Sequence, residues 1–230
     1  MFASIAPRYD FLNHLLSLSI DTYWRRRVVG LLAGRNPLPT DRCLDLCTGT
    51  GDLALDVARR LRIETTGLDF CHPMLVRLVA KIRDTDAVRV AESDARQLPF
   101  PEARFRFVTV AFGLRNIEHR ATALSEMVRV LEPGGSLVVL EFSRPTVPIV
   151  RGLFNAYFHR VLPVVGSWIS GTDRAYAYLP ESVSRFPGQD ALAREIESAG
   201  CVEVDYRNLT CGIAAMHWGM KPPRPPSPRH

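Results

Sequence analysis

The sequence Cys43-Leu44-Asp45-Leu46-Cys47-Thr48-Gly49-Thr50-Gly51-Asp52-Leu53 decides the fold of this chain. A short apolar run ends at two closely spaced glycines and then enters a run that favours a helix. In a parallel-sheet protein, such a strand carries the chain to a ligand at the carboxyl edge of the sheet. Glycine permits the tight turn against the ligand, and the following helix offers free N–H groups. We therefore expect Gly49 and Gly51 at a cofactor site.

A second feature is the acid at the end of the next apolar run, Thr66-Gly67-Leu68-Asp69. At the tip of the second strand, the Asp69 carboxylate would accept hydrogen bonds from two ribose hydroxyls. A dinucleotide fingerprint also needs a glycine at position 54, and the residue there is Ala54. A ligand without a pyrophosphate therefore fits better than NAD does. The glycine loop and Asp69 together indicate S-adenosylmethionine.

The composition is that of an ordinary soluble globular protein. The chain has 230 residues, of which 47% are hydrophobic and 23% are charged, and this allows one large domain or two small ones. The formal net charge of +5 is compatible with nucleic acid or an anionic membrane as a partner. However, Lys81 and Lys221 are the only lysines, and a bias to arginine along the whole chain differs from a local phosphate-binding face. We expect no nucleic-acid partner.

The cysteines argue against a metal site and against a disulfide framework. Five are present, at positions 43, 47, 71, 201 and 211, without a Cys-x-x-Cys pair. This pattern predicts reduced, mostly buried thiols in a cytoplasmic protein. The N-terminus has no basic start followed by an apolar run, and no apolar stretch reaches about 18 residues. We therefore expect neither a signal peptide nor a membrane-spanning helix.

The remaining pattern alternates strands and helices, which predicts an α/β protein whose mostly parallel sheet is covered on both faces. Two helices are expected within residues 8–33. The strands and helices expected next are 42–47, 52–61, 63–69, 73–84, 87–93, 106–112, 120–131 and 136–142. An insertion rich in aromatic residues and prolines follows at 147–187. After it come a helix, two strands and a disordered tail, at 189–199, 201–207, 211–217 and 221–230. Residues 1–220 are expected to form one domain.

Four separated motifs stand in order along the chain. They are Met1-Phe2-Ala3-Ser4-Ile5-Ala6-Pro7-Arg8-Tyr9-Asp10 with Asn13, Phe112-Gly113-Leu114-Arg115-Asn116, Leu140-Glu141-Phe142-Ser143-Arg144-Pro145, and Tyr176-Ala177-Tyr178-Leu179-Pro180-Glu181-Ser182-Val183 with Phe186-Pro187. Together they resemble the motifs of the quinone-biosynthesis C-methyltransferases, which methylate demethylmenaquinone and ubiquinone precursors on the ring. The resemblance runs from about residue 2 to residue 219 and covers nearly the whole chain.

The resemblance implies a class I Rossmann-like methyltransferase fold with S-adenosylmethionine as the cofactor. This fold has N-terminal helices, an antiparallel C-terminal strand and a helical insertion after the fifth strand. The implied cofactor-binding residues are Tyr9, Gly49, Thr50, Gly51, Asp69, Asp94, Ala95 and Ala111. Position 111 is a serine in some relatives, so a contact through that hydroxyl is lost here, although the backbone of Ala111 remains able to approach the ligand.

Methylation of a quinol ring carbon requires an electron-rich ring. A phenol ionises near pH 10, so holding the phenolate at pH 7 needs about 4 kcal/mol of stabilisation. An arginine facing the phenolate oxygen supplies part of it in a dry pocket. Arg115, just past the tip of the fourth strand, is the candidate, and Asn116 would orient it or bind the other ring oxygen. Because a guanidinium stays protonated, the expected proton acceptor is a water molecule, Asp10 or His119.

The expected function is S-adenosylmethionine-dependent methylation of a ring carbon of a prenylated quinol, with demethylmenaquinol as the first candidate. The alternatives are methylation of a methoxy-benzoquinol in the ubiquinone pathway and a non-catalytic role as a partner in a quinone-synthesis complex. The apolar prenyl tail needs a groove, which the insertion at 147–187 is expected to provide. Because that tail lies in a bilayer, we expect a cytoplasmic enzyme that transiently contacts the inner face of the membrane. A homodimer is also considered.

Overall fold

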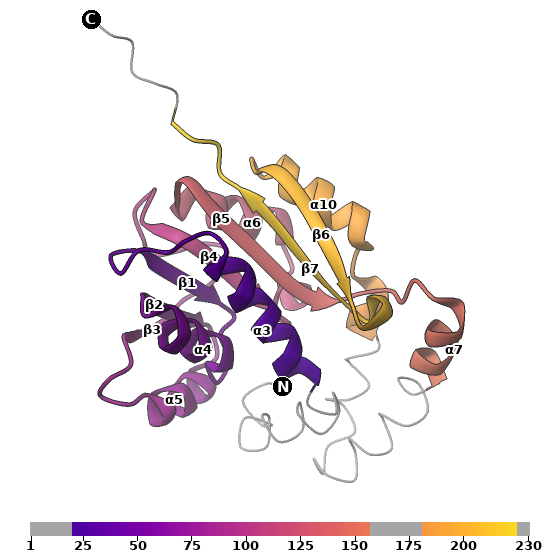
Figure 1. Ribbon diagram of the computed structural model, residues 1–230, viewed down its shortest axis with the longest axis horizontal. Coiled ribbons are helices and arrows are strands. Elements are labelled where there is room, and N and C mark those ends of the chain that lie inside the picture. Colours follow the sequence, from indigo (N-terminus) through magenta and orange to yellow (C-terminus); the bar gives the residue numbers. More distant parts are fainter. Residues whose placement is uncertain (1–19, 157–180, 225–230) are drawn as a thin grey trace, which may run out of the picture.

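Seven strands form one mixed sheet in the order β3-β2-β1-β4-β5-β7-β6 (Figure 1). The strands are β1 (Arg42–Leu46), β2 (Glu64–Asp69), β3 (Val88–Glu92), β4 (Phe105–Ala111), β5 (Leu131–Phe142), β6 (Val202–Leu209) and β7 (Ala214–Met220). This computed structural model describes residues 20–156 and 181–224. Tyr9 and Asp10 lie outside the described residues, as do 157–180 of the expected insertion and 225–230 of the expected tail.

Helices lie along the sheet and beyond its carboxyl edge. They are α3 (Ile20–Ala33), α4 (Asp52–Leu61), α5 (His72–Lys81), α6 (Arg120–Val130), α7 (Pro148–Ala156) and α10 (Gln189–Ser198), with 3₁₀ turns η2 (Leu114–Asn116) and η4 (Thr210–Gly212). Across 20–156 and 181–224, none of these helices has the length and apolar character needed to cross a bilayer. Helix α7 agrees with the helical insertion expected after the fifth strand.

The direction of the strands confirms the fold class that the sequence predicted. Each neighbouring pair from β3 to β5 is parallel. The last strand, β7, runs antiparallel to both of its neighbours, β5 and β6. This is the mostly parallel sheet with an antiparallel C-terminal strand that the family resemblance implied.

The central strands are buried on both faces, as their continuous apolar runs predicted. Leu44 and Leu46 join a core cluster that α6 and α10 cover. Cys43, which lies on the opposite face of the same strand, joins a second cluster that α3 and α4 cover. Figure 1 shows α3 in front of the sheet and α6 behind it. The sheet is therefore the middle of three layers.

The connections diverge between β1 and β4. Strand β1 pairs with β2 on one side and with β4 on the other, so the chain leaves these two neighbouring strands in opposite directions. Open α/β sheets bind ligands in the crevice that forms where the loops separate in this way. The fold therefore brings the segments after β1, β2, β3 and β4 around one space.

Two strand boundaries differ from the sequence expectation. Strand β7 begins at Ala214 instead of residue 211. The residues before it form η4, with left-handed backbone at Thr210 (φ 46°), Cys211 (φ 55°) and Gly212 (φ 87°). Strand β5 begins at Leu131 instead of residue 136, because Leu131 already pairs with β4 ahead of a shift in register. A bulge and a tight turn therefore moved these two boundaries.

Lys221 corrects the expected start of the disordered tail. Its Nζ donates hydrogen bonds to the carbonyls of Arg129 (3.0 Å) and Leu131 (2.9 Å) at the end of α6. A cation is favourable at a helix C-terminus, where carbonyl groups lack partners within the helix. The backbone of Lys221 also pairs with the first part of β5. Lys221 therefore belongs to the folded structure, and its assignment to the tail at 221–230 was wrong.

Asp45 is a buried carboxylate beneath the glycine loop, and its side chain shapes that loop. It accepts hydrogen bonds from the hydroxyls of Thr109 and Thr48, both at 2.7 Å. Burial raises the pKa of Asp45 to about 6, and the two hydroxyls oppose this shift only in part. The ionised carboxylate is therefore unfavourable in the folded state relative to water.

We predict that Asp45→Asn removes a pH dependence of stability. The unfolded carboxyl group, with its ordinary pKa of 3.8, releases its proton at lower pH than the folded one does. The wild-type free energy of unfolding should therefore fall between about pH 4 and pH 6, by up to about 3 kcal/mol, and stay level above that range. The variant should lack this fall, as measured by urea denaturation at pH 4, 5, 6 and 7. An equal fall in the variant would contradict the raised pKa.

Candidate active site

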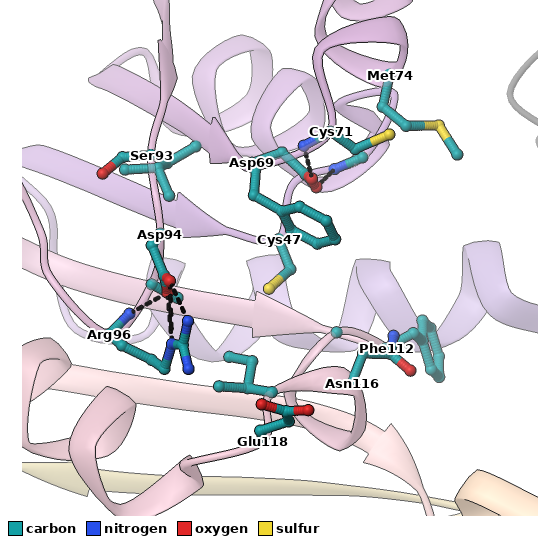
Figure 2. Close-up of a pocket in the computed structure, with 16 residues that line it drawn as sticks. Cys47, Asp69, Cys71, Met74, Ser93, Asp94, Arg96, Phe112, Asn116 and Glu118 are labelled. Carbon is teal, nitrogen blue, oxygen red and sulfur yellow. Dashed lines mark hydrogen bonds and ion pairs between the residues drawn. The ribbon is translucent and has the colours of Figure 1, made fainter. Parts of the chain in front are cut away.

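A cavity of about 390 Å³ opens at the carboxyl edge of the sheet. It is lined by residues from 47–49, 68–74, 93–96 and 112–118, which follow β1, β2, β3 and β4. Figure 2 shows side chains from all four segments around this space. The cavity brings together five of the residues that the sequence predicted for the site, namely Gly49, Asp69, Asp94, Ala95 and Asn116.

Asp69 joins two of the loops that line the cavity. One carboxylate oxygen accepts the Gly49 N–H at 2.8 Å, and the other accepts the Cys71 N–H at 2.9 Å. Burial raises the pKa of Asp69, and the backbone N–H groups lower it. A carboxylate has about four acceptor positions, so Asp69 can still accept the ribose hydroxyls expected from the sequence. Its two backbone bonds also keep the glycine loop next to the start of α5.

Asp94 and Arg96 form a paired group on the β3 side of the cavity (Figure 2). The guanidinium of Arg96 donates from Nε (3.0 Å) and Nη2 (2.7 Å) to one carboxylate oxygen of Asp94. The Arg96 amide donates to the other oxygen at 2.8 Å. The side-chain hydrogen bonds from Arg96 lower the pKa of Asp94 most, and the hydrogen bond from the Arg96 amide lowers it further. The arrangement fixes both side chains beside Ala95.

The glycine loop is held in shape by residues that do not line the cavity. Gly51 has φ 83°, and a Cβ at that position would lie 2.0 Å from Cδ1 of Leu78. Only glycine therefore fits there without displacing α5. The predicted residues Thr50 and Ala111 are also absent from the cavity lining, and Thr50 is buried. Their predicted contacts to the cofactor stay predictions.

The turn after β4 contains the predicted catalytic residues, and the structure separates them. Asn116 lines the cavity. Arg115 does not, and its side chain is only 8% exposed and paired with Glu141 at 2.6 Å. His119 is exposed at the N-cap of α6, next to the lining residue Glu118. The predicted roles of these residues in catalysis stay untested.

Two non-glycine residues that line the cavity, Cys47 and Phe112, have left-handed backbone. Cys47 has φ 51° and Phe112 has φ 56°. A Cβ at Gly113 would lie 2.2 Å from the Cβ of Cys47. Left-handed backbone is uncommon outside glycine and is often found at functional sites. The close packing of Cys47 on Gly113 therefore explains why the motif after β4 needs a glycine at this position.

An aromatic cluster connects this turn to helix α3. The Phe112 ring lies 5.8 Å from Trp24 and 4.9 Å from Phe142, measured between ring centroids. The indole Nε1 of Trp24 donates to the Thr210 hydroxyl at 2.8 Å. Because Phe112 also lines the cavity, helix α3 contacts the wall of the site through one ring.

Sequence reasoning missed several residues that line the cavity. They are Cys47, Phe70, Met74, Arg96, Ile117 and Glu118. Each lies within seven residues of the end of a strand, and this position was the signal that the sequence offered for them. Glu141, which pairs with Arg115, was also missed as a functional candidate, although it lies in one of the four motifs.

These residues fit S-adenosylmethionine better than a dinucleotide. Asp69 supplies a buried acceptor at the tip of β2, and Asp94, which is exposed, supplies another acceptor after β3. Apolar groups from Ala95, Met74 and Ile117 suit the flat faces of an adenine ring. Position 54 in α4 is a fully buried alanine. The chain therefore lacks the glycine that would complete a pyrophosphate-binding pattern. The cavity thus contains the two acids that the sequence predicted, together with apolar side chains from Met74 and Ile117 that it did not predict.

A family model extends this assignment from the site to the chain. The model of the ubiE/COQ5 methyltransferase family matches residues 1–221. The chain belongs to this family. It is an S-adenosylmethionine-dependent methyltransferase, and the resemblance found in the sequence is confirmed.

Curated relatives match along nearly their whole length. The chain is 49% identical to a demethylmenaquinone methyltransferase of Thermus thermophilus, over 96% of this chain and 100% of the relative. It is 45% identical to the enzyme of the same name in Deinococcus radiodurans, over 96% of this chain and 91% of the relative. It is also 41% identical to a ubiquinone/menaquinone biosynthesis C-methyltransferase of Geotalea daltonii, over 96% and 94%.

Solved structures agree on the fold at low sequence identity. A Haloferax volcanii putative methyltransferase in complex with the activator Trm112 matches with a TM-score of 0.67 and 16% identity, over 96% of this chain and 98% of that one. The [4+2]-cyclase SpnF matches with a TM-score of 0.65 and 20% identity, over 86% and 81%. Since a cyclase shares the architecture, the fold alone does not determine the reaction.

We predict that Gly113→Ala destabilises the protein and that Cys47→Gly reverses the effect. The added Cβ would overlap that of Cys47, and overpacking of this kind costs about 1–3 kcal/mol. Removing the Cys47 Cβ eliminates the overlap and suits the left-handed backbone at that position. Thermal unfolding of the single and double variants measures both effects.

Gly30→Ala is the matched control, because a Cβ at Gly30 has no heavy atom within 4 Å. We expect this control to be as stable as the wild type or slightly more stable, since alanine is the better helix residue. A double variant as unstable as Gly113→Ala would show that the contact with Cys47 is not the cause.

Proposed function

We propose that this chain methylates a ring carbon of a prenylated quinol, with demethylmenaquinol as the substrate and menaquinol as the product. The observation that carries the proposal is the 49% identity to a demethylmenaquinone methyltransferase across that relative's full length. Relatives of the same name in Deinococcus radiodurans and Staphylococcus aureus support it at 45% and 39% identity. The reaction belongs to quinone biosynthesis.

Binding of the cofactor is assigned to the segments after β1, β2 and β3. S-Adenosylmethionine supplies a methyl group bonded to a positively charged sulfur. In this proposal, Asp69 accepts the ribose hydroxyls, and Asp94 with Ala95 holds the adenine side. Gly49 and Gly51 let the loop approach the ligand, and Thr50, Ala111 and Tyr9 complete the predicted contacts. Holding the donor and the ring carbon about 3–3.5 Å apart and aligned then contributes much of the rate.

The residues of the β4 turn are assigned to the quinol. Arg115 would favour the phenolate, which needs about 4 kcal/mol at pH 7. Its burial strengthens any hydrogen bond that it makes to a substrate oxygen. Asn116, which lines the cavity, would bind the ring or orient Arg115. A water molecule, Asp10 or His119 would take the proton, and exposure of His119 supports transfer from there to solvent.

A second candidate substrate is the methoxy-benzoquinol of the ubiquinone pathway. The 41% identity to a relative named for both ubiquinone and menaquinone biosynthesis favours it. A non-catalytic role in a quinone-synthesis complex is the other alternative.

The proposal also includes transient contact of the protein with a membrane surface and a peripheral cytoplasmic location. Ile149, which is 77% exposed on α7, supports the membrane contact. A homodimer remains part of the proposal.

The substrate test supplies reduced demethylmenaquinol and the methoxy-benzoquinol separately, in detergent micelles with labelled S-adenosylmethionine. We expect methylated product from demethylmenaquinol at a rate at least about tenfold higher, since three relatives carry that name alone. Mass spectrometry of the extracted quinols identifies the product. Faster methylation of the methoxy-benzoquinol would favour the second candidate. Binding of S-adenosylmethionine without product from either quinol would favour the non-catalytic role.

We predict that Arg115→Gln lowers turnover by about 10²–10³, the usual cost of losing one preorganised partner of a developing anion. Calorimetry should give an S-adenosylmethionine affinity within a few-fold of wild type. Arg115→Lys should recover part of the loss, because lysine keeps the charge but lacks the planar fork. Higher pH should partly rescue the glutamine variant, since the quinol then ionises without help. Joint loss of affinity and turnover, with no rescue by pH, would mean that Arg115 is structural.

A further inference from the structure

Glu141 is a buried acid near the carboxyl end of β5 that receives three hydrogen bonds. One oxygen accepts Arg115 Nη1 at 2.6 Å and the Phe142 N–H at 2.9 Å. The other oxygen accepts the Arg115 N–H at 3.2 Å. Only 1% of the Glu141 side chain is exposed. The carboxylate therefore holds the backbone and the side chain of Arg115 at once, from the neighbouring strand.

Two further contacts hold the Arg115 side chain, and one of its donors has no partner. Its Nη1 also donates to the carbonyl of Phe112. Its guanidinium carbon lies 5.4 Å from the centroid of the Phe142 ring, which is cation–π distance. Its Nε is buried and has no hydrogen-bond partner. A buried donor without a partner is unfavourable, and an acceptor atom of a bound ligand would relieve it.

This network reaches the wall of the cavity. Phe112, whose carbonyl Arg115 holds, has left-handed backbone at φ 56° and lines the cavity together with Gly113 and Asn116. A non-glycine residue keeps such a conformation only where its surroundings enforce it. The hydrogen bonds that Arg115 donates to Glu141 and to the carbonyl of Phe112 supply that enforcement. The position of the turn therefore depends on an acid that does not line the cavity itself.

We propose that Glu141 is a positioning residue for methyl transfer, because its carboxylate fixes the Arg115 guanidinium and the 112–116 turn in the geometry that serves the quinol oxygen. This inference rests on the proposed function. Two effects of the acid oppose each other. As a negative charge it weakens the attraction of Arg115 for a phenolate, and as an anchor it keeps Arg115 in place. A buried arginine that loses its partner becomes an unpaired cation, so the anchoring effect dominates.

The test is a double-mutant cycle of Arg115→Gln, Glu141→Gln and the combined variant in the full-length chain. The combined variant replaces the buried ion pair with two neutral amides, so it leaves no unpaired charge and is the variant expected to fold best. If Glu141 acts through Arg115, Glu141→Gln alone lowers kcat by about 30–100-fold. The combined variant is then no worse than Arg115→Gln, within about three-fold. S-Adenosylmethionine affinity stays within about three-fold in all of them.

The pH profile of kcat separates the two effects of Glu141. If anchoring dominates, Glu141→Gln moves the rise of kcat to higher pH, in the same direction as Arg115→Gln does. If Glu141 only offsets the charge of Arg115, its loss favours the phenolate and moves the rise to lower pH. A shift to lower pH, or losses that multiply in the combined variant, would overturn the proposal.

Asp21→Asn is the matched control, because Asp21 forms a similarly buried ion pair with Arg25 at 2.8 Å in α3. We expect it to lower the melting temperature without moving the pH profile of kcat. A shift in this control equal to that of Glu141→Gln would mean that any buried ion pair gives the effect, and would overturn the proposal. Turnover of the wild-type chain tests the proposed function separately. If the wild type methylates neither quinol, the proposed function and the role of Glu141 are both refuted. If the wild type is active but the losses from Arg115→Gln and Glu141→Gln multiply in the combined variant, only the role of Glu141 is refuted.

Discussion

The pairing of β1 with both β2 and β4 is the constraint on which the rest of the site depends. A parallel strand buried on both faces must be followed by a connection that crosses the sheet, and the hand of that crossing is fixed. The chain first crosses toward β3 and then returns to β4 on the other side of β1. The loops after these strands therefore separate at one edge. The cavity arises from this topology, and the loop residues then determine what it binds.

Carboxylates hold these loops in place, and each one uses backbone N–H groups or hydroxyls. Asp45 binds two hydroxyls beneath the glycine loop, and Asp69 binds the amides of Gly49 and Cys71. Glu141 does the same for the turn after β4. Buried charges lower stability unless they are paired or hydrogen-bonded. Three such acids near one cavity therefore lower the stability of the fold while they fix the geometry of the loops around the cavity. Catalysis by preorganisation benefits from this exchange.

The sequence predicted the features that depend on local signals. The glycine loop, the acid at the end of β2 and the alternation of strands and helices each lie within a few consecutive residues, and the structure has all three. Glu141 could not be assigned to Arg115, because 26 positions separate them and the pairing exists only once β4 and β5 lie side by side. The left-handed backbone of Cys47 and Phe112 was equally hidden, since neither residue type signals it.

The boundary of β5 and the start of the tail also differ from the sequence prediction because of contacts that only the folded chain makes. The helix α6 and the strand β5 adjoin at Leu131, where the sequence shows proline and two glycines and therefore suggests a loop. Pairing with β4 overrides that local preference, as tertiary contacts commonly do. Lys221 was placed in a proline-rich tail by composition, but its ammonium finds carbonyl partners that only the folded chain presents.

The contact between Trp24 and Phe112 has an optical consequence. Trp24 is 2% exposed, and the ring it touches is part of the cavity wall. A buried indole emits at short wavelength, and its emission responds to small changes in the packing around it. Movement of the Phe112 ring when a ligand enters would therefore be transmitted to an intrinsic fluorophore on the far side of that wall. Trp24 is therefore the tryptophan placed to report a change in the packing of Phe112 at the site.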